Sequence, residues 1–224
     1  MKLSVAPLAR ARYLQEGDVS FSNLYARVGG FFRRRRKRFL FAEFHDSQTV
    51  VDLGGTVESW GSGAFRSTTI VNVIPRTRPL PPNFYYVRAD GCSVPLEGRF
   101  DLAFSNSAIE HVGTRERQQQ FANEMMRLGC RIYCQTPNRW FPVETHYLAL
   151  FVHWLPPRWF GHVLHRYFTL QGWAGRPSRA ESQEIRKREA IRLLNKRELQ
   201  ELFPGCKIRT ERVLGWPKSY VAWR

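Results

Sequence analysis

Three features that would each define a class of protein are scarce in this sequence: closely spaced cysteines, long uncharged runs and acidic side chains. The 224 residues include four cysteines, whose uneven spacing does not form the framework of a disulfide-stapled secreted domain. The longest run without Asp, Glu, Lys or Arg is the 13 residues Thr145–Pro157, whereas a membrane-spanning helix needs roughly 20 apolar residues. Met1–Arg12 has no apolar core of a secretory signal, so we expect a cytoplasmic protein.

Several motifs for nucleotides and metals are also missing. Neither G-x-G-x-x-G nor G-x-x-x-x-G-K-[ST] occurs, so the chain has no cradle for the phosphates of a dinucleotide or a triphosphate. Neither C-x-x-C nor H-E-x-x-H occurs, and we interpret Cys130 and Cys134 as buried thiols around a core strand. We therefore expect no metal site, and a cofactor without a pyrophosphate.

Acidic side chains are few: 19 Asp and Glu stand against 35 Lys and Arg, a formal net charge of +16. The excess lies at the two ends, since residues 1–44 carry 10 basic and 3 acidic side chains and residues 158–224 carry 15 and 6. The densest run is Arg33–Arg38, which lies between phenylalanines. It indicates an anionic partner, nucleic acid or a lipid surface, although a solvated helix would carry the same charges. The phenylalanines favour peripheral contact with the inner face of an anionic membrane.

The middle of the chain alternates between predicted strands and helices. β-branched and apolar runs bounded by turn residues predict strands buried on both faces of a parallel sheet, over residues 49–53, 69–74, 84–88, 100–105 and 131–135. Helical spacing predicts helices over 115–128, capped by Thr114, and over 181–194, and Asn195 with Glu198 has the form of a capping box. Two strands, 207–214 and 219–223, close the chain. The fold class is α/β: a Rossmann-like, doubly wound, mostly parallel sheet with a C-terminal antiparallel strand, flanked by helices.

The domain organisation follows from the charge and the aromatic residues. We expect residues 1–44 to form a basic extension or helix and residues 45–224 to form one domain. A segment from about 140 to 177, rich in Trp, Tyr, Phe and His and broken by prolines, looks like a lid-like insertion. Within it, Tyr147–Phe160 is either part of a core lid or a surface that lies on a bilayer.

Small and polar residues follow each of the first four predicted strands. The carboxyl ends of parallel strands are where open α/β sheets bind ligands, so these residues are expected to meet in one site. Glycines let the backbone approach a ligand, a polar group after the second strand can hold ribose hydroxyls, and an Asp after the third can accept from an adenine amino group. The predicted cofactor-binding residues are Asp52, Gly54, Gly55, Asn72, Asp90, Gly91, Cys92, Ser105 and Asn106.

Four segments give the sequence a family resemblance. VVDLGGTVESW (50–60), TIVNVIP (69–75), RADGCSVPL (88–96) and FDLAFSNSAIEHVG (100–113) resemble the motifs of class I S-adenosylmethionine-dependent methyltransferases, the small-molecule group called type 11. The resemblance covers about residues 45–155 and implies S-adenosylmethionine as the cofactor. The chain departs from the family where Thr56 and Val57 replace a third glycine. Asn72 also stands where an acidic residue normally holds the ribose.

The resemblance also limits the acceptor. Amine-directed members typically carry [ND]-P-P-[YF] after the fourth strand, where this chain has Ser105-Asn106-Ser107-Ala108. A hydroxyl or a carbon of a small or lipid-linked molecule is therefore the expected acceptor, with His111 as the candidate general base. Glu144 and His146 form a second candidate acid/base pair. Two alternatives stay open: an RNA methyltransferase, suggested by the positive charge, and a non-catalytic binding module with this fold, suggested by the altered glycine loop.

Overall fold

The computed structural model describes residues 19–60, 65–144, 149–151, 154 and 191–224. The chain divides into two compact units, one formed by Met1–Lys37 with Pro142–Arg188 and the other by Arg38–Phe141 with Glu189–Arg224. In the first unit, β6 (Val143–Glu144) pairs with β7 (Ala149–Leu150) in a two-stranded antiparallel sheet. The helix α1 (Val19–Glu43) begins in the first unit and ends in the second. No helix among the described residues is both long and apolar enough to cross a membrane.

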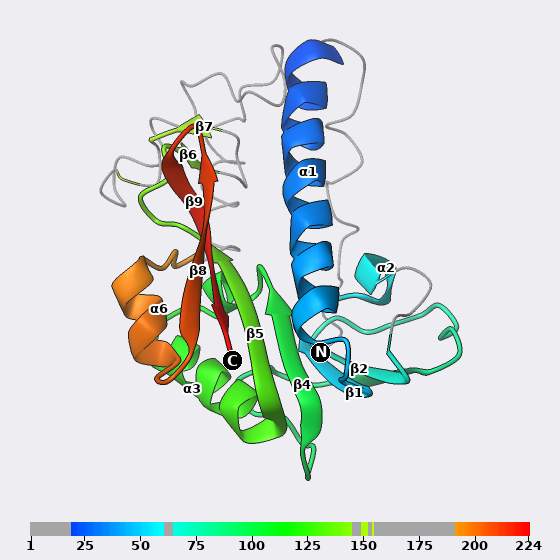
Figure 1. Ribbon diagram of the computed structural model, residues 1–224. Coiled ribbons are helices and arrows are strands. Elements are labelled where there is room, and N and C mark those ends of the chain that lie inside the picture. The colour runs from blue at the N-terminus through cyan, green and yellow to red at the C-terminus, as the bar shows by residue number, and fades with distance from the viewer. Residues whose placement is uncertain (1–18, 61–64, 145–148, 152–153, 155–190) are drawn as a thin grey trace, which may run out of the picture. The chain divides into compact units, whose positions relative to one another are not determined.

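The second unit is built on a seven-stranded sheet with the order β3-β2-β1-β4-β5-β9-β8 (Figure 1). The neighbours from β3 to β5 pair in parallel, whereas β9 runs antiparallel to both β5 and β8. This arrangement confirms the predicted mostly parallel sheet with a C-terminal antiparallel strand. The strands are β1 (Thr49–Leu53), β2 (Ser67–Asn72), β3 (Phe84–Arg88), β4 (Phe100–Asn106), β5 (Gly129–Pro137), β8 (Lys207–Val213) and β9 (Trp216–Trp223).

Several strands have other bounds than the sequence predicts. β4 and β8 each end one residue from the predicted position, and β9 begins at Trp216 rather than Ser219, because Val213 pairs with Trp216. β2 stops at Asn72 rather than Ile74, because the side-chain oxygen of Asn72 accepts from the N–H of Ile74 at 3.0 Å and turns the chain out of the ladder. β5 continues through Thr136 and Pro137, because β9 pairs with both of these residues. The strand tolerates Pro137 because this residue occupies its last position.

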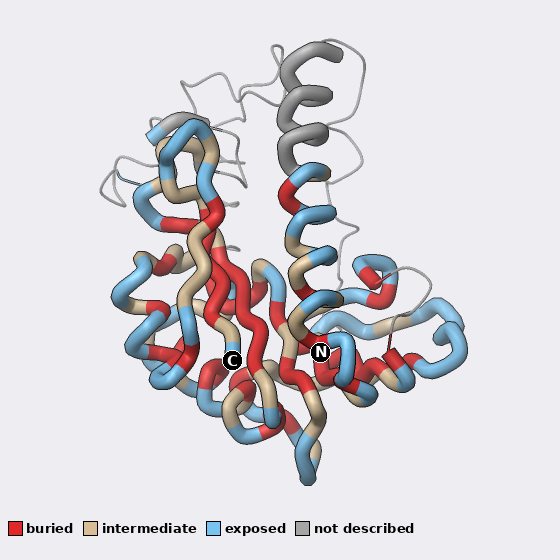
Figure 2. Tube along the Cα trace, in the orientation of Figure 1, coloured by how far each residue is buried: buried red, intermediate tan, exposed pale blue. Residues whose placement is uncertain are grey.

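Side chains of the central strands alternate between two apolar clusters. β1 and β5 are buried along most of their length (Figure 2), as expected for strands covered on both faces. One face packs on α3 (Arg115–Leu128) and α6 (Lys196–Leu202). The other face packs on the end of α1 and on the short helix α2 (Val57–Trp60) through Leu40, Phe44, Val57 and Trp60.

The connecting segments differ in whether they contain helices. Thr114 caps α3, and Asn195 and Glu198 form the predicted capping box of α6. The connections from β2 to β3 and from β3 to β4, residues 73–83 and 89–99, contain no helix. The helix predicted over 181–194 lies mostly outside the described residues. Its predicted end is wrong, because 191–194 is extended and Leu194 forms a bridge with Asn138.

Candidate functional site

The loop after β1 leaves room only for glycine. Gly54 has φ +82°, and its N–H donates to the carbonyl of Val71 at 2.8 Å. A Cβ at Gly54 would lie 2.4 Å from the Cβ of Ala108, which follows β4. A side chain at Gly54 would therefore push the carboxyl ends of β1 and β4 apart, so packing alone already requires a glycine at this position.

A buried carboxylate lies directly beneath this loop. Asp52 has no exposed surface, and its Oδ2 accepts a hydrogen bond from the indole Nε1 of Trp60 at 2.7 Å. A Cβ at Gly55 would lie 1.8 Å from the same Oδ2, so the loop can cover the carboxylate only because residue 55 is glycine. The other oxygen, Oδ1, is buried and has no hydrogen-bond partner in the part of the chain that the structure describes. A buried carboxylate oxygen left in this state is costly, and it marks a place where a donor or a positive charge is missing.

The environment of Asp52 changes its chemistry. Burial raises the pKa of Asp52 to about 7, and the hydrogen bond from Trp60 only partly opposes that rise. Near neutral pH the group therefore exchanges between the acid and the carboxylate. A nearby cation would favour the carboxylate form.

Asn72 ties the same loop to β2. Its Nδ2 donates to the carbonyls of Gly54 at 3.3 Å and Gly55 at 2.9 Å, and its Oδ1 accepts from Ile74. Both amide protons are thus used within the protein, and one lone pair of Oδ1 remains for a ribose hydroxyl. An acidic side chain at this position could not donate to these two carbonyls. The structure therefore gives a reason for an asparagine where the motif usually has an acidic residue.

The residues after β3 are held by α3. Asp90 accepts from the N–H of Cys92 at 2.9 Å and from Nη2 of Arg117 at 2.6 Å. Partial burial acts to raise the pKa of Asp90, but the hydrogen bonds from Arg117 and Cys92 outweigh it and lower the pKa. Burial, together with the charge of Asp90, raises the pKa of the Cys92 thiol to about 11, so Cys92 is not a nucleophile near neutral pH. A Cβ at Gly91 would lie 2.7 Å from the ring of Phe121.

The end of β4 is joined to its neighbours on both sides. The Ser105 hydroxyl is buried and donates to the carbonyl of Leu53 at 3.0 Å, which fixes β4 against β1. Asn106 is exposed at the last position of the strand. The hydroxyl of Ser107, which has φ +55°, donates to the side chain of Gln135 at 2.8 Å. Of the predicted pair, Ser105 has a structural bond and Asn106 faces solvent.

His111 ends the short helix η2 (Ile109–His111) that follows β4. Its side chain is 39% exposed, and its Nε2 lies 3.9 Å from Oε1 of the fully buried Glu110. Oε2 of Glu110 accepts from the hydroxyl of Thr136 at 3.0 Å. His111 therefore reaches solvent next to a carboxylate fixed by β5, an arrangement that suits a general base.

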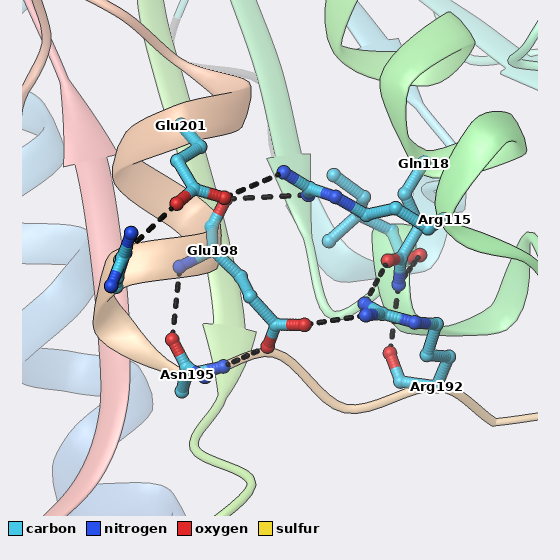
Figure 3. Close-up of polar contacts among 8 residues, drawn as sticks. Arg115, Gln118, Arg192, Asn195, Glu198 and Glu201 are labelled. Carbon is cyan, nitrogen blue, oxygen red and sulfur yellow. Dashed lines mark hydrogen bonds and ion pairs between the residues drawn. The ribbon is translucent and has the colours of Figure 1, made fainter.

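A polar cluster brings a later part of the chain back to η2 (Figure 3). Gln118 donates to the carbonyls of Ile109 at 3.2 Å and Arg192 at 2.7 Å, and its side-chain oxygen accepts from Arg192 at 2.7 Å. Arg192 also forms an ion pair with Glu198, which belongs to the capping box with Asn195. The segment that follows residue 190 is thereby fixed beside the candidate base.

The remaining predicted residues are placed as follows. Glu144 lies in β6, and His146 lies outside the described residues, as does most of the predicted lid. Cys134 is buried, but the prediction for Cys130 is wrong: Cys130 is exposed. It comes before Tyr133, where the pairing of β5 with β9 begins, so it has no strand beside it on that side. No group of His, Cys, Asp and Glu suited to a metal is found among the described residues.

Three residues of the site were missed by the sequence analysis. The sequence analysis assigned no role to Trp60, the last residue of the segment 50–60. Its hydrogen bond to Asp52 depends on the turn between the two residues. Glu110 precedes the candidate base, and an acidic residue within a short apolar stretch could have signalled a buried carboxylate. Gln118 lies on the apolar face of α3 with Phe121, Ala122 and Met125, and a polar residue at such a position signals a buried hydrogen bond.

Comparisons with known proteins add to this geometry. No protein-family model matches the sequence, and neither does any curated protein. The structure is similar to that of magnesium protoporphyrin IX methyltransferase from Synechocystis PCC 6803. The form with bound S-adenosylhomocysteine has 14% identity and a TM-score of 0.55, over 95% of this chain and 90% of that chain. The form with bound S-adenosylmethionine has 13% identity and a TM-score of 0.53, over 95% and 88%.

A second enzyme has a similar structure. The N-methyltransferase NodS from Bradyrhizobium japonicum WM9, in complex with S-adenosylhomocysteine, has 8% identity and a TM-score of 0.50, over 85% of each chain. At these identities the likeness shows the fold alone. The chain has the fold of class I S-adenosylmethionine-dependent methyltransferases, as the sequence motifs imply.

Proposed function

We propose that this chain is a methyltransferase that uses S-adenosylmethionine and methylates a hydroxyl or a carbon of a small or lipid-linked molecule. The observation that carries the proposal is the buried Asp52 with one oxygen lacking a hydrogen-bond partner, beneath a two-glycine loop at the carboxyl end of β1. Solved enzymes with the same fold hold S-adenosylmethionine or S-adenosylhomocysteine. The buried carboxylate of Asp52 favours a positively charged ligand, and S-adenosylmethionine carries an ammonium and a sulfonium group.

The residues at this edge fit such a cofactor. The backbone of Gly54 and Gly55 would lie against its amino acid part, where no side chain intervenes. The charge of Asp52 would attract the ammonium group, across the thin layer of backbone at Gly55. Asn72 has one lone pair left for the ribose, and the exposed side chains of Val73 and Ile74 offer apolar surface to a base. Asp90, Gly91 and Cys92 would contact the adenine end of the cofactor.

The protein's part in the reaction is alignment and proton transfer. When bound, S-adenosylmethionine would supply its methyl group to a nucleophile that attacks in line with the bond between carbon and sulfur, with S-adenosylhomocysteine as the leaving group. Residues of the chain must hold an acceptor hydroxyl in that line and remove its proton, which His111 could do because its side chain reaches solvent beside Glu110. Ser105 and Asn106 would form the floor between the cofactor and the acceptor. Glu144 and His146 remain a proposed second acid/base or substrate-binding pair.

Two other functions remain as alternatives. Arg33–Lys37 and Arg38 are exposed except for the half-buried Arg36, so α1 could bind RNA as well as the inner face of an anionic membrane. A non-catalytic module is favoured by the use of both Asn72 amide protons within the protein. The missing [ND]-P-P-[YF] motif argues against a base amine as the acceptor.

Titration of S-adenosylhomocysteine into the purified protein tests the proposal. We expect binding in the low micromolar range, roughly 8 kcal/mol. Gly55→Asp should abolish it, since any side chain at this position collides with Asp52. Gly98→Ala is the matched control: Gly98 has φ +81° but open space around its Cβ, so the variant should lose some stability and keep the binding. A folded wild-type protein that does not bind would favour the non-catalytic module.

A further inference from the structure

The β8–β9 hairpin carries an unusual turn. Val213 pairs with Trp216, which leaves Leu214 and Gly215 as a two-residue loop with φ +49° and +84°. Positive φ at both positions is the geometry of a type I′ turn, in which Asn-Gly is the preferred pair. A leucine at the first position strains the backbone, and its side chain is 97% exposed. Neither local geometry nor packing explains why a leucine stands there.

Two exposed tryptophans accompany this leucine. Trp216, at the start of β9, is 56% exposed, and Trp140, after β5, is 55% exposed. Asn138 joins their segments, because its N–H donates to the carbonyl of Lys218 at 2.9 Å and its Nδ2 to the carbonyl of Pro217 at 2.7 Å. The same Asn138 accepts from the N–H of Trp140 at 3.1 Å. Hydrogen bonds of Asn138 thus link the segments of both tryptophans where β5 ends and β9 begins.

The charge around these residues is positive. Arg139 and Arg212 are exposed, and the guanidinium of Arg139 lies 5.5 Å from the centre of the Trp140 ring. Neither residues 137–141 nor residues 212–218 contain an Asp or a Glu. Exposed Leu and Trp between cations is the composition that suits the boundary between lipid headgroups and acyl chains.

The turn projects at the functional edge of the sheet. β9 begins where β5 ends, since Ser219 pairs with Pro137, and the turn extends beyond that pair. The parallel strands β1, β2, β4 and β5 end at this same edge. Figure 1 shows the hairpin continuing past the end of β5.

We propose that the tip formed by Leu214, Trp216 and Trp140, with Arg139 and Arg212, docks on an anionic lipid bilayer. A bilayer fits because a single protruding leucine can enter acyl chains without a preformed pocket, and anionic headgroups complement the arginines. This surface lies in the described second unit and differs from the run Arg33–Arg38. Docking would bring a lipid-linked acceptor to the site, and this part of the proposal rests on the proposed function. The docking itself is independent of the proposed function.

Leu214→Asn separates docking from folding. It creates the preferred Asn-Gly turn and removes the apolar tip, so the fold should be at least as stable while lipid binding falls. The matched control is Leu80→Asn, which replaces another exposed leucine, 40% exposed, in the loop that precedes the edge strand β3. The probe is vesicles of equal parts phosphatidylcholine and phosphatidylglycerol, with cosedimentation of the full chain as the measurement.

We expect the wild-type chain and Leu80→Asn to bind these vesicles equally and Leu214→Asn to bind about tenfold more weakly. Wild-type protein that does not bind, or equal binding of Leu214→Asn and wild type, would overturn the proposal. Titration of S-adenosylhomocysteine into the same samples keeps the two proposals apart. S-adenosylhomocysteine should bind both variants as it binds the wild type. If it binds none of the three proteins, the proposed function is contradicted, while the docking result still stands.

Discussion

Two aspartates at the same edge of the sheet show opposite chemistry. Asp90, after β3, is partly exposed and accepts hydrogen bonds at both oxygens, from Arg117 and from the backbone of Cys92. Asp52, near the end of β1, is fully buried, and among the described residues Trp60 is its hydrogen-bond partner. The pKa of Asp90 is lowered and that of Asp52 is raised to about 7.

The difference separates a carboxylate whose charge the protein itself balances from a buried carboxylate with a raised pKa. The protein itself supplies the positive charge that Asp90 needs, so Asp90 holds the loop after β3 against α3. At Asp52, burial is the largest influence on the pKa, and the hydrogen bond from Trp60 opposes it. A group kept in this state is more often functional than structural, because the fold gains nothing from it.

The largest expected effect comes from Asp52→Asn. The raised pKa means that folded Asp52 keeps a proton that the unfolded chain loses above about pH 4, so its contribution to stability is lost as pH rises from about 4 to about 7. Asn stays neutral, so the variant should be more stable than wild type at about pH 8, by up to about 4 kcal/mol, and similar at about pH 4. Urea unfolding at both pH values measures this. Parallel pH profiles for the two proteins would contradict it.

The affinity for the cofactor should also depend on pH. Because the ammonium group of S-adenosylhomocysteine should favour the Asp52 carboxylate, this ligand should bind about tenfold more tightly at about pH 8 than at about pH 6. Asp52→Asn should bind more weakly, with an affinity that does not change over this range. Calorimetric titration of both proteins provides the comparison, and a pH-dependent affinity in the variant would assign the titration to another group.

Asp90→Asn should have the smallest effect, with the opposite sign. It removes the ion pair with Arg117, whose two side chains are each 43% exposed, and keeps an acceptor for the N–H of Cys92. Screening by solvent limits the loss of stability to about 1 kcal/mol, present near neutral pH and lost on acidification below about pH 4. Urea unfolding at neutral pH measures the loss. A gain in stability would remove the contrast between the two aspartates.

Much of this edge could be predicted from the sequence because its signals are local. The apolar runs 49–53 and 84–88 predict the observed bounds of β1 and β3. The capping box of α6 needs only Asn195 and Glu198. The glycines after β1 and the polar residues after each strand follow from chain order alone, since parallel strands end at one edge.

Side-chain partners could not be predicted in the same way. The bond from Trp60 to Asp52 depends on how α2 turns back, and the link from Thr136 to Glu110 spans 26 residues. The position of Asn72 after β2 predicts a contact with a ribose, but not the hydrogen bonds that its amide donates to the carbonyls of Gly54 and Gly55. The exposure of Leu214 depends on the register of β8 with β9, which propensity does not fix.

The most direct test of the account is a crystal structure of the protein with S-adenosylhomocysteine. We expect the ligand across the carboxyl ends of β1 and β2, with its ammonium group over Gly54 and Gly55 on the side of Asp52. Density for the ligand elsewhere, or none at a saturating concentration, would contradict the claim that Asp52 and its glycine loop form a cofactor site.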